Sequence, residues 1–353
     1  MSDFAMRAIR SVSALALICA SLTAASAQTA TSKIVRAANA FLSSLDENQR
    51  QRALFSFDDQ KQRANWSNLP VSFVPRSGVS LKEMNPTQRS AAMALLSSML
   101  SARGFEKVQQ IMEGDEVNKT SGAPPGGAPG TASSEPIFGR DLYYISFLGK
   151  PSETDPWMLQ FGGHHLALNV TIAGARGVLT PTLTGAQPAL FTSNGKTVRP
   201  LGQESDKALA LLNALDENQR KQAILSYRLA DLVLGPGQDG KTIQPEGLQA
   251  SAMSERQRAM LLDLISEWAG IIHESAAAAR MAEMKGDLNE TWFAWSGPVT
   301  ADPGKNITAY YRVQGPHLVI EYAPQRLGGD PSMHVHTMYR DPTNDYGRRV
   351  TAK

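Results

Sequence analysis

One hexapeptide occurs twice in this chain, and its recurrence limits the possible folds more than any other feature. Leu-Asp-Glu-Asn-Gln-Arg runs over 45–50 and again over 215–220. Each copy opens an apolar run with helical spacing. Further along, Gln88-Arg89 is matched by Gln257-Arg258 at almost the same offset. Because several features repeat in the same order, we interpret the chain as a tandem duplication.

Each half begins with sequence typical of helices and continues with sequence typical of strands. Asp46 and Asp216 are predicted to cap helices that reach about Phe57 and Leu229, and a longer helix is predicted over 253–286. Strand-like runs with glycine turns follow in both halves. The sequence therefore predicts an α+β fold of two tandem pseudo-repeats, each a helical hairpin or bundle followed by an antiparallel β-meander. The predicted repeats are 28–202 and 203–353.

The first residues, 1–27, have the pattern of an export signal. Two arginines precede an apolar run from Val12 to Ala25, and Ala25-Ser26-Ala27 is the small-x-small pattern that signal peptidase cleaves. The run is shorter than the ~20 residues that a bilayer needs, which favours cleavage over a retained anchor. We therefore expect a periplasmic or secreted protein with no stable membrane insertion after the signal is removed.

Composition narrows the possible partners and chemistry. Cys19 is the only cysteine and lies in the predicted signal, so a metal in the mature chain must be held by His, Asp, Glu or backbone oxygens. Without the signal, 33 basic residues face 32 acidic ones. A nucleic-acid-binding protein should carry a basic stripe, but the longest basic cluster is Arg348-Arg349, near the end of the chain. We therefore expect no nucleic-acid partner.

Two segments rich in glycine and proline are interpreted as loops. The composition of residues 121–136 predicts a flexible surface loop. Residues 235–242, Gly-Pro-Gly-Gln-Asp-Gly-Lys-Thr, match the phosphate-loop pattern, which requires a helix starting at its Lys-Thr. Pro245 and Gly247 follow directly and oppose such a helix. We therefore interpret 235–242 as a turn and expect no ATP partner.

Histidines near the C-terminus suggest a metal site. Alternate residues of a strand share a face, so His334 and His336 would point the same way, close enough to bind one ion. In the preceding strand the same alternation places Glu321 on the face opposite the apolar residues. In the corresponding strand of the first half it likewise places His165 opposite the apolar residues. The predicted metal ligands are therefore His165, Glu321, His334 and His336. A metal-free polar site and a purely structural role remain alternatives, and His164 is expected to lie in the core.

A polar turn directly after these histidines supplies candidate catalytic groups. Asp341 or Asp345 could orient a ligand imidazole or act as general base toward a bound water, and Arg340 could hold an anionic substrate. The alternative is a capped turn stabilised by an Arg-Asp pair.

Several motifs, taken in order, resemble a known family. They are Gly162-Gly163-His164-His165, Gly185-Ala186-Gln187-Pro188, Gly315-Pro316 with Ile320-Glu321, His334-Val335-His336, and Arg340-Asp341-Pro342. Over nearly all of the mature chain they resemble the bacterial domain-of-unknown-function family 3500. The resemblance implies an exported protein with a recurrent layout, but no reaction. It favours His164, His165, Glu321, His334 and His336 as ligands, whereas His317 falls outside the pattern.

The predicted donor set limits the chemistry. Two or three imidazoles with a carboxylate and an open position suit Zn²⁺ in hydrolysis or Fe²⁺ in oxygen activation. Our leading hypothesis is an exported metal-dependent hydrolase that holds a divalent ion, with Zn²⁺ as the first candidate, and acts on a small molecule. One alternative is an oxygen-using enzyme with iron or copper on the same ligands. Another is a non-catalytic extracytoplasmic module that binds a small ligand.

Overall fold

A mostly antiparallel sheet organises the fold. The computed structural model describes residues 27–120, 136–327 and 329–351, and within these ranges twelve strands form one sheet and two short strands form another. The α+β class is therefore as predicted. The proposed export signal, except for Ala27, and the proposed loop 121–136, except for Pro136, lie outside the described residues.

The helices and strands follow one another in a similar order in the two halves. After helical residues 27–44, the first half contains α2 (Glu47–Ala53), β1 (Leu54–Phe55), α3 (Gln60–Arg63), β2 (Val79–Ser80), α4 (Pro86–Met99), α5 (Ala102–Thr120), β3 (Tyr144–Leu148), β4 (Trp157–Gly162), β5 (Leu166–Ala173), β6 (Arg176–Val178), β7 (Thr182–Ala186), β8 (Phe191–Ser193) and β9 (Lys196–Val198). The second half contains α6 (Gly202–Ala214), α7 (Glu217–Ala223), β10 (Leu248–Gln249), α8 (Glu255–Ala269), α9 (Glu274–Gly286), β11 (Trp292–Ser296), β12 (Tyr310–Gly315), β13 (Leu318–Pro324), β14 (Val335–Arg340) and α10 (Arg348–Thr351).

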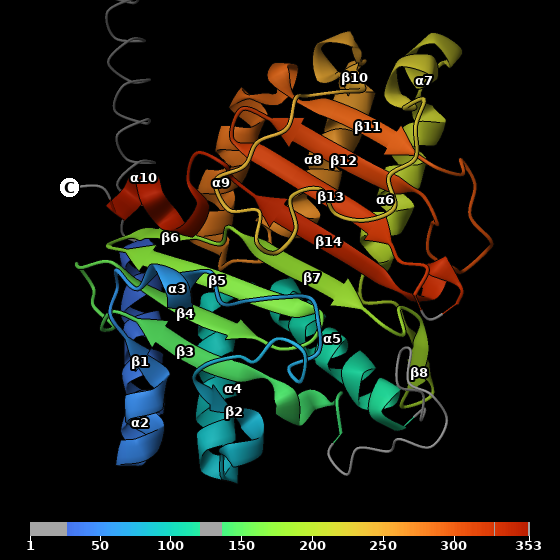
Figure 1. Cartoon of the computed structure of the whole chain (residues 1–353). Helices are drawn as coiled ribbons and strands as arrows, with labels where there is room; N and C mark the ends of the chain where they lie inside the picture. The colour runs from blue at the N-terminus through green and yellow to red at the C-terminus, as the bar shows by residue number, and fades with distance from the viewer. Residues whose placement is uncertain (1–26, 121–135, 328, 352–353) are drawn as a thin grey trace, which may run out of the picture.

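The large sheet is continuous across both predicted repeats. Its order is β1-β3-β4-β5-β7-β14-β13-β12-β11-β10, so the first-half strands occupy one end and the second-half strands the other (Figure 1). The two ends meet where β7 pairs antiparallel with β14, with Gly185 opposite His336. This pairing joins 28–202 to 203–353 through backbone hydrogen bonds.

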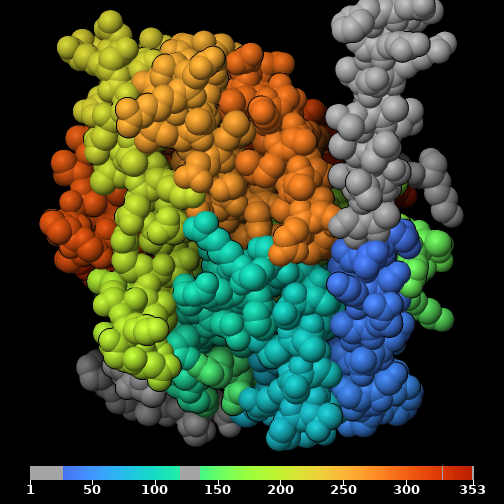
Figure 2. Space-filling view, turned by 180° about the vertical axis from the view of Figure 1, so that it is seen from behind, coloured from blue at the N-terminus to red at the C-terminus, as the bar shows by residue number. Residues whose placement is uncertain are grey.

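Helices cover one face of the sheet, and irregular segments cover the other. Helices α4, α5, α6 and α8 lie behind the sheet in Figure 1, and in the space-filling view from behind their colours cover most of this face (Figure 2). Two large apolar clusters fill the space between helices and strands. Across the opposite face run residues 56–78 and 225–247, which bond to sheet side chains such as Gln160 and Glu321. The central strands are therefore buried on both sides, as β5 and β14 are throughout their length.

The repeated hexapeptide has a structural explanation. Asp46 and Asp216 cap α2 and α7, each accepting from the backbone N–H of the glutamine three residues later, at 2.8 and 2.9 Å. In each half this glutamine also hydrogen-bonds the capping glutamine of the next long helix, Gln88 or Gln257. The motif therefore fastens two helix starts to each other.

Several helices are shorter than the apolar spacing suggested. The helices α2 and α7 end at Ala53 and Ala223, because Leu54 and Ile224 turn to pair with the sheet. The long helix predicted over 253–286 is two helices, separated after Gly270. None of the described helices combines the length and apolarity that a membrane crossing requires.

Arg340 fastens the segment 225–247 to the end of β14. Its guanidinium donates to the carbonyls of Leu234 and Gly235 and pairs with Asp239 and Asp345, both at 2.8 Å. The side chain is buried. The pair of Arg340 with Asp345 matches the turn stabilised by an Arg-Asp pair that was the alternative to a substrate-binding role.

Replacing Arg340 should destabilise the fold strongly. Arg340→Met leaves two carboxylates without their cation and takes a donor from each of two carbonyls, and breaking a buried pair in this way costs about 3–5 kcal/mol. Urea denaturation measures the loss. The exposed Arg348→Met serves as the matched control and should change the free energy of unfolding by less than about 0.5 kcal/mol. An Arg340→Met protein as stable as this control would contradict a stabilising role for the buried contacts of Arg340.

Candidate metal centre

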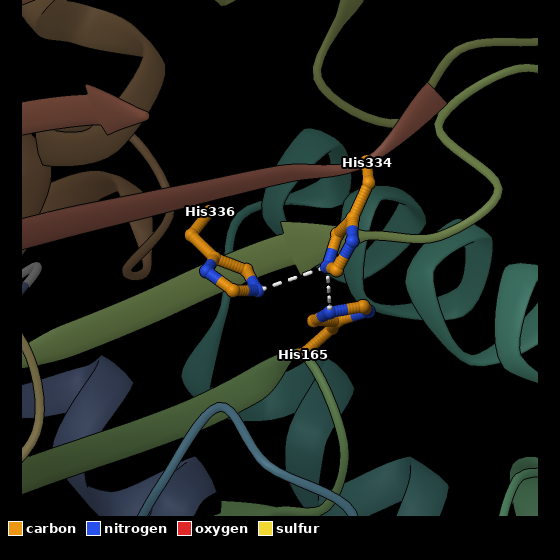
Figure 3. Close-up of side chains that lie close together, drawn as sticks. All are labelled: His165, His334 and His336. Atoms are coloured by element: carbon orange, nitrogen blue, oxygen red, sulfur yellow. Dashed lines mark hydrogen bonds between the residues drawn. The ribbon is translucent and has the colours of Figure 1, made fainter. Parts of the chain in front are cut away.

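Three buried histidines point their ring nitrogens at one another on the face of the sheet opposite the helices (Figure 3). The Nε2 atom of His334 lies 3.0 Å from Nε2 of His165 and 3.1 Å from Nε2 of His336. One ligand atom from each of the three lies within 4.8 Å of the others. Nitrogens bound to Zn²⁺ at about 2.1 Å in a tetrahedron are separated by about 3.4 Å, so the observed spacing fits a shared ion.

Strand geometry explains how these rings meet. His334 directly precedes β14 and His336 lies within it, so the two share a face as predicted. His165 precedes β5 in a left-handed conformation with φ 59°, and its carbonyl accepts from the N–H of Gly185 at 2.7 Å. A Cβ on Gly185 would lie 3.1 Å from Cδ2 of His165. The glycine opposite His336 therefore leaves room for the third imidazole.

The outer nitrogen of His334 defines its ligand atom. Nδ1 lies 2.8 Å from the carbonyl of Leu327, and a carbonyl can only accept, so Nδ1 carries the proton and donates it. In the neutral ring Nε2 then presents a lone pair toward the other two histidines. A metal ligand needs this tautomer, and the outer hydrogen bond that fixes it is common at metal sites.

The other two histidines have different outer surroundings. Nδ1 of His336 lies 3.2 Å from the amide nitrogen of Asn68 and 3.7 Å from the carboxylate of Asp231. Nδ1 of His165 is buried and has no hydrogen-bond partner among the described residues. The outer side of the His165 ring is therefore held by packing, and its only ring hydrogen bond among the described residues is the contact of Nε2 with His334.

Burial keeps the imidazoles neutral. It lowers the pKa of His334 to about 3, with the neighbouring His336 adding to the effect. Burial also lowers the pKa of His336, and it lowers the pKa of His165 well below its usual value together with the adjacent imidazoles. Neutral imidazole is the form that binds metal ions, so these rings need not lose a proton to bind one near neutral pH.

The fourth predicted ligand, Glu321, lies outside the cluster, which corrects the predicted ligand set. It stands opposite Met338, two residues beyond His336 on the same face, so strand parity held. Its carboxylate accepts from the backbone N–H groups of Val233 and Leu234, at 2.7 and 2.8 Å, and from the hydroxyl of Tyr310 at 2.7 Å. Segment 225–247 and Tyr310 therefore bind the carboxylate, and Glu321 is not among the residues whose ligand atoms converge with those of the histidines.

The three predicted catalytic residues are also distant from the histidines. Arg340, Asp341 and Asp345 lie at or beyond the other end of β14, separated from His334 by about 20 Å of strand. Asp341 pairs with Arg280 at 3.0 Å and accepts from Thr343, and Asp345 pairs with Arg340. General-base and anion-holding roles at the histidine cluster are therefore corrected to structural ones.

His164 and His317 lie outside the three-histidine cluster. His317 contacts Asp287 at 2.7 Å in a half-buried position. His164 is buried, as expected, with its Nδ1 2.8 Å from the carboxylate of Asp115. Asp115, His164 and His165 form a second group whose ligand atoms lie within 4.8 Å of one another.

Sequence reasoning missed Asp115, although a signal was present. In α5 the buried residues Val108, Ile111 and Met112 define an apolar helix face by their spacing, and Asp115 continues it. A carboxylate on such a face must have a buried partner. The spacing of apolar residues in 102–120 could therefore have indicated a polar partner, such as a histidine, packed against this helix.

Comparison with known proteins agrees with the motif analysis. Residues 27–348, nearly the whole chain, match the model of a family described as "Protein of unknown function (DUF3500)". The chain belongs to this family. The resemblance read from the motifs is thereby confirmed, and the DUF3500 match includes all three histidines of the cluster. No curated protein and no solved structure gives a significant match.

The lowered pKa values predict a loss of stability in mild acid. The folded-state pKa of each histidine is below the unfolded value of about 6.5, so their contribution is present above pH 6.5 and is lost as the pH falls toward the folded value. The slope is at most about 1.4 kcal/mol per pH unit for each imidazole.

Denaturation of metal-free protein between pH 7 and pH 5 tests this expectation. The double variant His334→Gln, His336→Gln should show a flatter dependence of the unfolding free energy on pH, because two of the titrating groups are gone. Equal slopes for the two proteins would show that these histidines do not have the lowered pKa values.

Proposed function

We propose that this chain is a metal-binding protein in which His165, His334 and His336 hold one divalent ion, and that it is a metal-dependent hydrolase. The observation that carries the proposal is the approach of three neutral Nε2 atoms, with spacings of 3.0 and 3.1 Å. One bare lone pair cannot accept two linear hydrogen bonds from the same side. An ion between the three nitrogens satisfies all of them at once.

The donor set favours zinc over iron. Three imidazoles with a fourth position open to water or substrate are a known zinc arrangement in catalysis, whereas the iron oxygenase triad uses two histidines and a carboxylate. Glu321, the candidate carboxylate, is bound elsewhere. Copper is the second candidate, because imidazole suits it and no carboxylate is required. Zinc in an open site activates water and polarises a carbonyl or phosphoryl oxygen.

The surroundings support a small-molecule substrate. Asn68 and Leu327 both contact the histidines, while the residues Leu327 and Leu69, which is next to Asn68, are 61% and 45% exposed. The imidazoles therefore lie about one residue below the surface. A small substrate could reach the ion through a local displacement of the covering segments, whereas a folded macromolecule could not.

We also propose that the two halves arose by duplication and that the protein is exported. Duplication is supported by the equivalent caps at Asp46 and Asp216 and by the mirrored strand order. Asn169 faces Gln160 as Glu321 faces Arg312, so the two meanders share a register. Export is supported by the pattern of residues 1–27. The active site would then belong to a periplasmic or secreted enzyme.

Metal analysis of protein purified from its native compartment tests the proposed centre. We expect about one zinc per chain in the wild type, and loss of the metal in His334→Ala and His336→Ala. Glu321→Gln is the matched control, because it alters the rejected ligand and should keep the metal while lowering stability. Removing the metal from the wild type should lower its melting temperature, since an ion that binds only the folded state stabilises it.

Screening of ester, amide and phosphoester substrates tests the hydrolase assignment. Hydrolysis should require the metal and should be abolished in His336→Ala but retained in Glu321→Gln. If the purified protein instead contains copper, consumes oxygen and hydrolyses none of the substrates, the assignment changes to an oxygen-using copper enzyme. A wild-type protein that contains no metal and takes up none would contradict the centre itself.

A further inference from the structure

Asp115 is a buried carboxylate that has no lysine or arginine partner in the part of the chain that the structure describes. It lies on α5 with 2% of its surface exposed, and its contacts are the hydroxyl of Tyr143 at 2.7 Å and Nδ1 of His164 at 2.8 Å. No lysine or arginine in the described ranges forms an ion pair with it. A buried ionised group is costly unless a compensating charge is near. The burial of Asp115 without a lysine or arginine partner therefore needs a physical reason.

A chain of contacts leads from Asp115 to the metal centre. The ring of His164, held by Asp115, lies against the ring of His165 with centroids 3.5 Å apart. The Tyr143 hydroxyl lies between the two residues and donates its one proton either to Asp115, at 2.7 Å, or to the carbonyl of His164, at 2.8 Å. His165 itself has no hydrogen bond at Nδ1 within the described ranges. The His164 ring, tilted by 33° to that of His165, therefore packs against this imidazole, whose other polar contact is Nε2 with His334.

We infer that Asp115 is a positioning residue and the buried counter-charge of the metal centre, acting through His164 on the ligand His165. The inference rests on the proposed function, because it needs a divalent cation on His165, His334 and His336. Three neutral imidazoles leave the double positive charge of that cation uncompensated. Asp115 supplies negative charge from the His165 side, and the partly exposed Asp231 supplies it from the His336 side.

The inference gives opposite expectations for the two states of the protein. In the metal-free state burial raises the pKa of the Asp115 carboxyl and no metal cation lies near it, so Asp115→Asn should leave the melting temperature unchanged or raise it. In the metal-bound state the same change removes the counter-charge and weakens the hold on His165. We therefore expect zinc affinity to fall about 10- to 100-fold, the usual cost of losing a group that supports a metal ligand.

Zinc titration and thermal denaturation of the metal-free protein measure both effects. With Co²⁺ in place of zinc, the visible spectrum of Asp115→Asn should also shift, because the His165 ring is less firmly oriented. Asp345→Asn is the matched control, since it removes a carboxylate that is also buried but is paired with Arg340. It should lower stability and leave zinc affinity and the Co²⁺ spectrum unchanged.

Each other outcome overturns the inference. Unchanged zinc affinity in Asp115→Asn, or a loss of metal-free stability as large as in Asp345→Asn, makes Asp115 a purely structural residue. Two ions per chain, one of them lost in Asp115→Asn, make it a direct ligand of a second ion. If Asp115→Asn does not fold, the variant Tyr143→Phe tests the inference instead. This variant should bind zinc several-fold more weakly than the wild type, and unchanged binding overturns the inference. A wild type without zinc defeats the proposed function, whereas zinc bound equally by wild type and variant defeats this inference alone.

Discussion

The pairing of β7 with β14 is the constraint on which the rest of the structure depends. It joins the two halves of the chain into one sheet and aligns Gly185 with His336. The backbone of Gly185 in turn holds that of His165, which is 169 residues from His334 in the sequence. A slip of one residue in this register would turn His334 and His336 toward the helices. The three-histidine cluster therefore exists only in this register.

Burial on both faces of the sheet gives the cluster its chemical character. Helices close one side, and the segments 56–78 and 225–247 close the other. The imidazoles are therefore neutral, and the low polarity strengthens any interaction with a cation. The covering segments also supply outer contacts, from Asn68 and Asp231 to His336. The cover that excludes bulk water thus also contacts the proposed ligand His336.

Local patterns were sufficient for some of this structure and insufficient for the rest. Strand parity placed His334 and His336 on one face, and the repeated hexapeptide placed two helix starts correctly. Parity also put Glu321 on the right face, but its carboxylate is taken by backbone groups of Val233 and Leu234. The path of that segment is set by long-range packing, such as the contacts of Arg340, which no local period encodes.

The central claim is that three imidazoles share one ion. X-ray absorption spectroscopy of the metal-loaded protein tests it most directly, because imidazole rings give a characteristic scattering pattern and the bond lengths identify the donors. The account predicts about three imidazole nitrogens at roughly 2.0–2.1 Å from a single zinc, with one further light atom. A coordination shell of oxygen alone, without imidazole scattering, would contradict it.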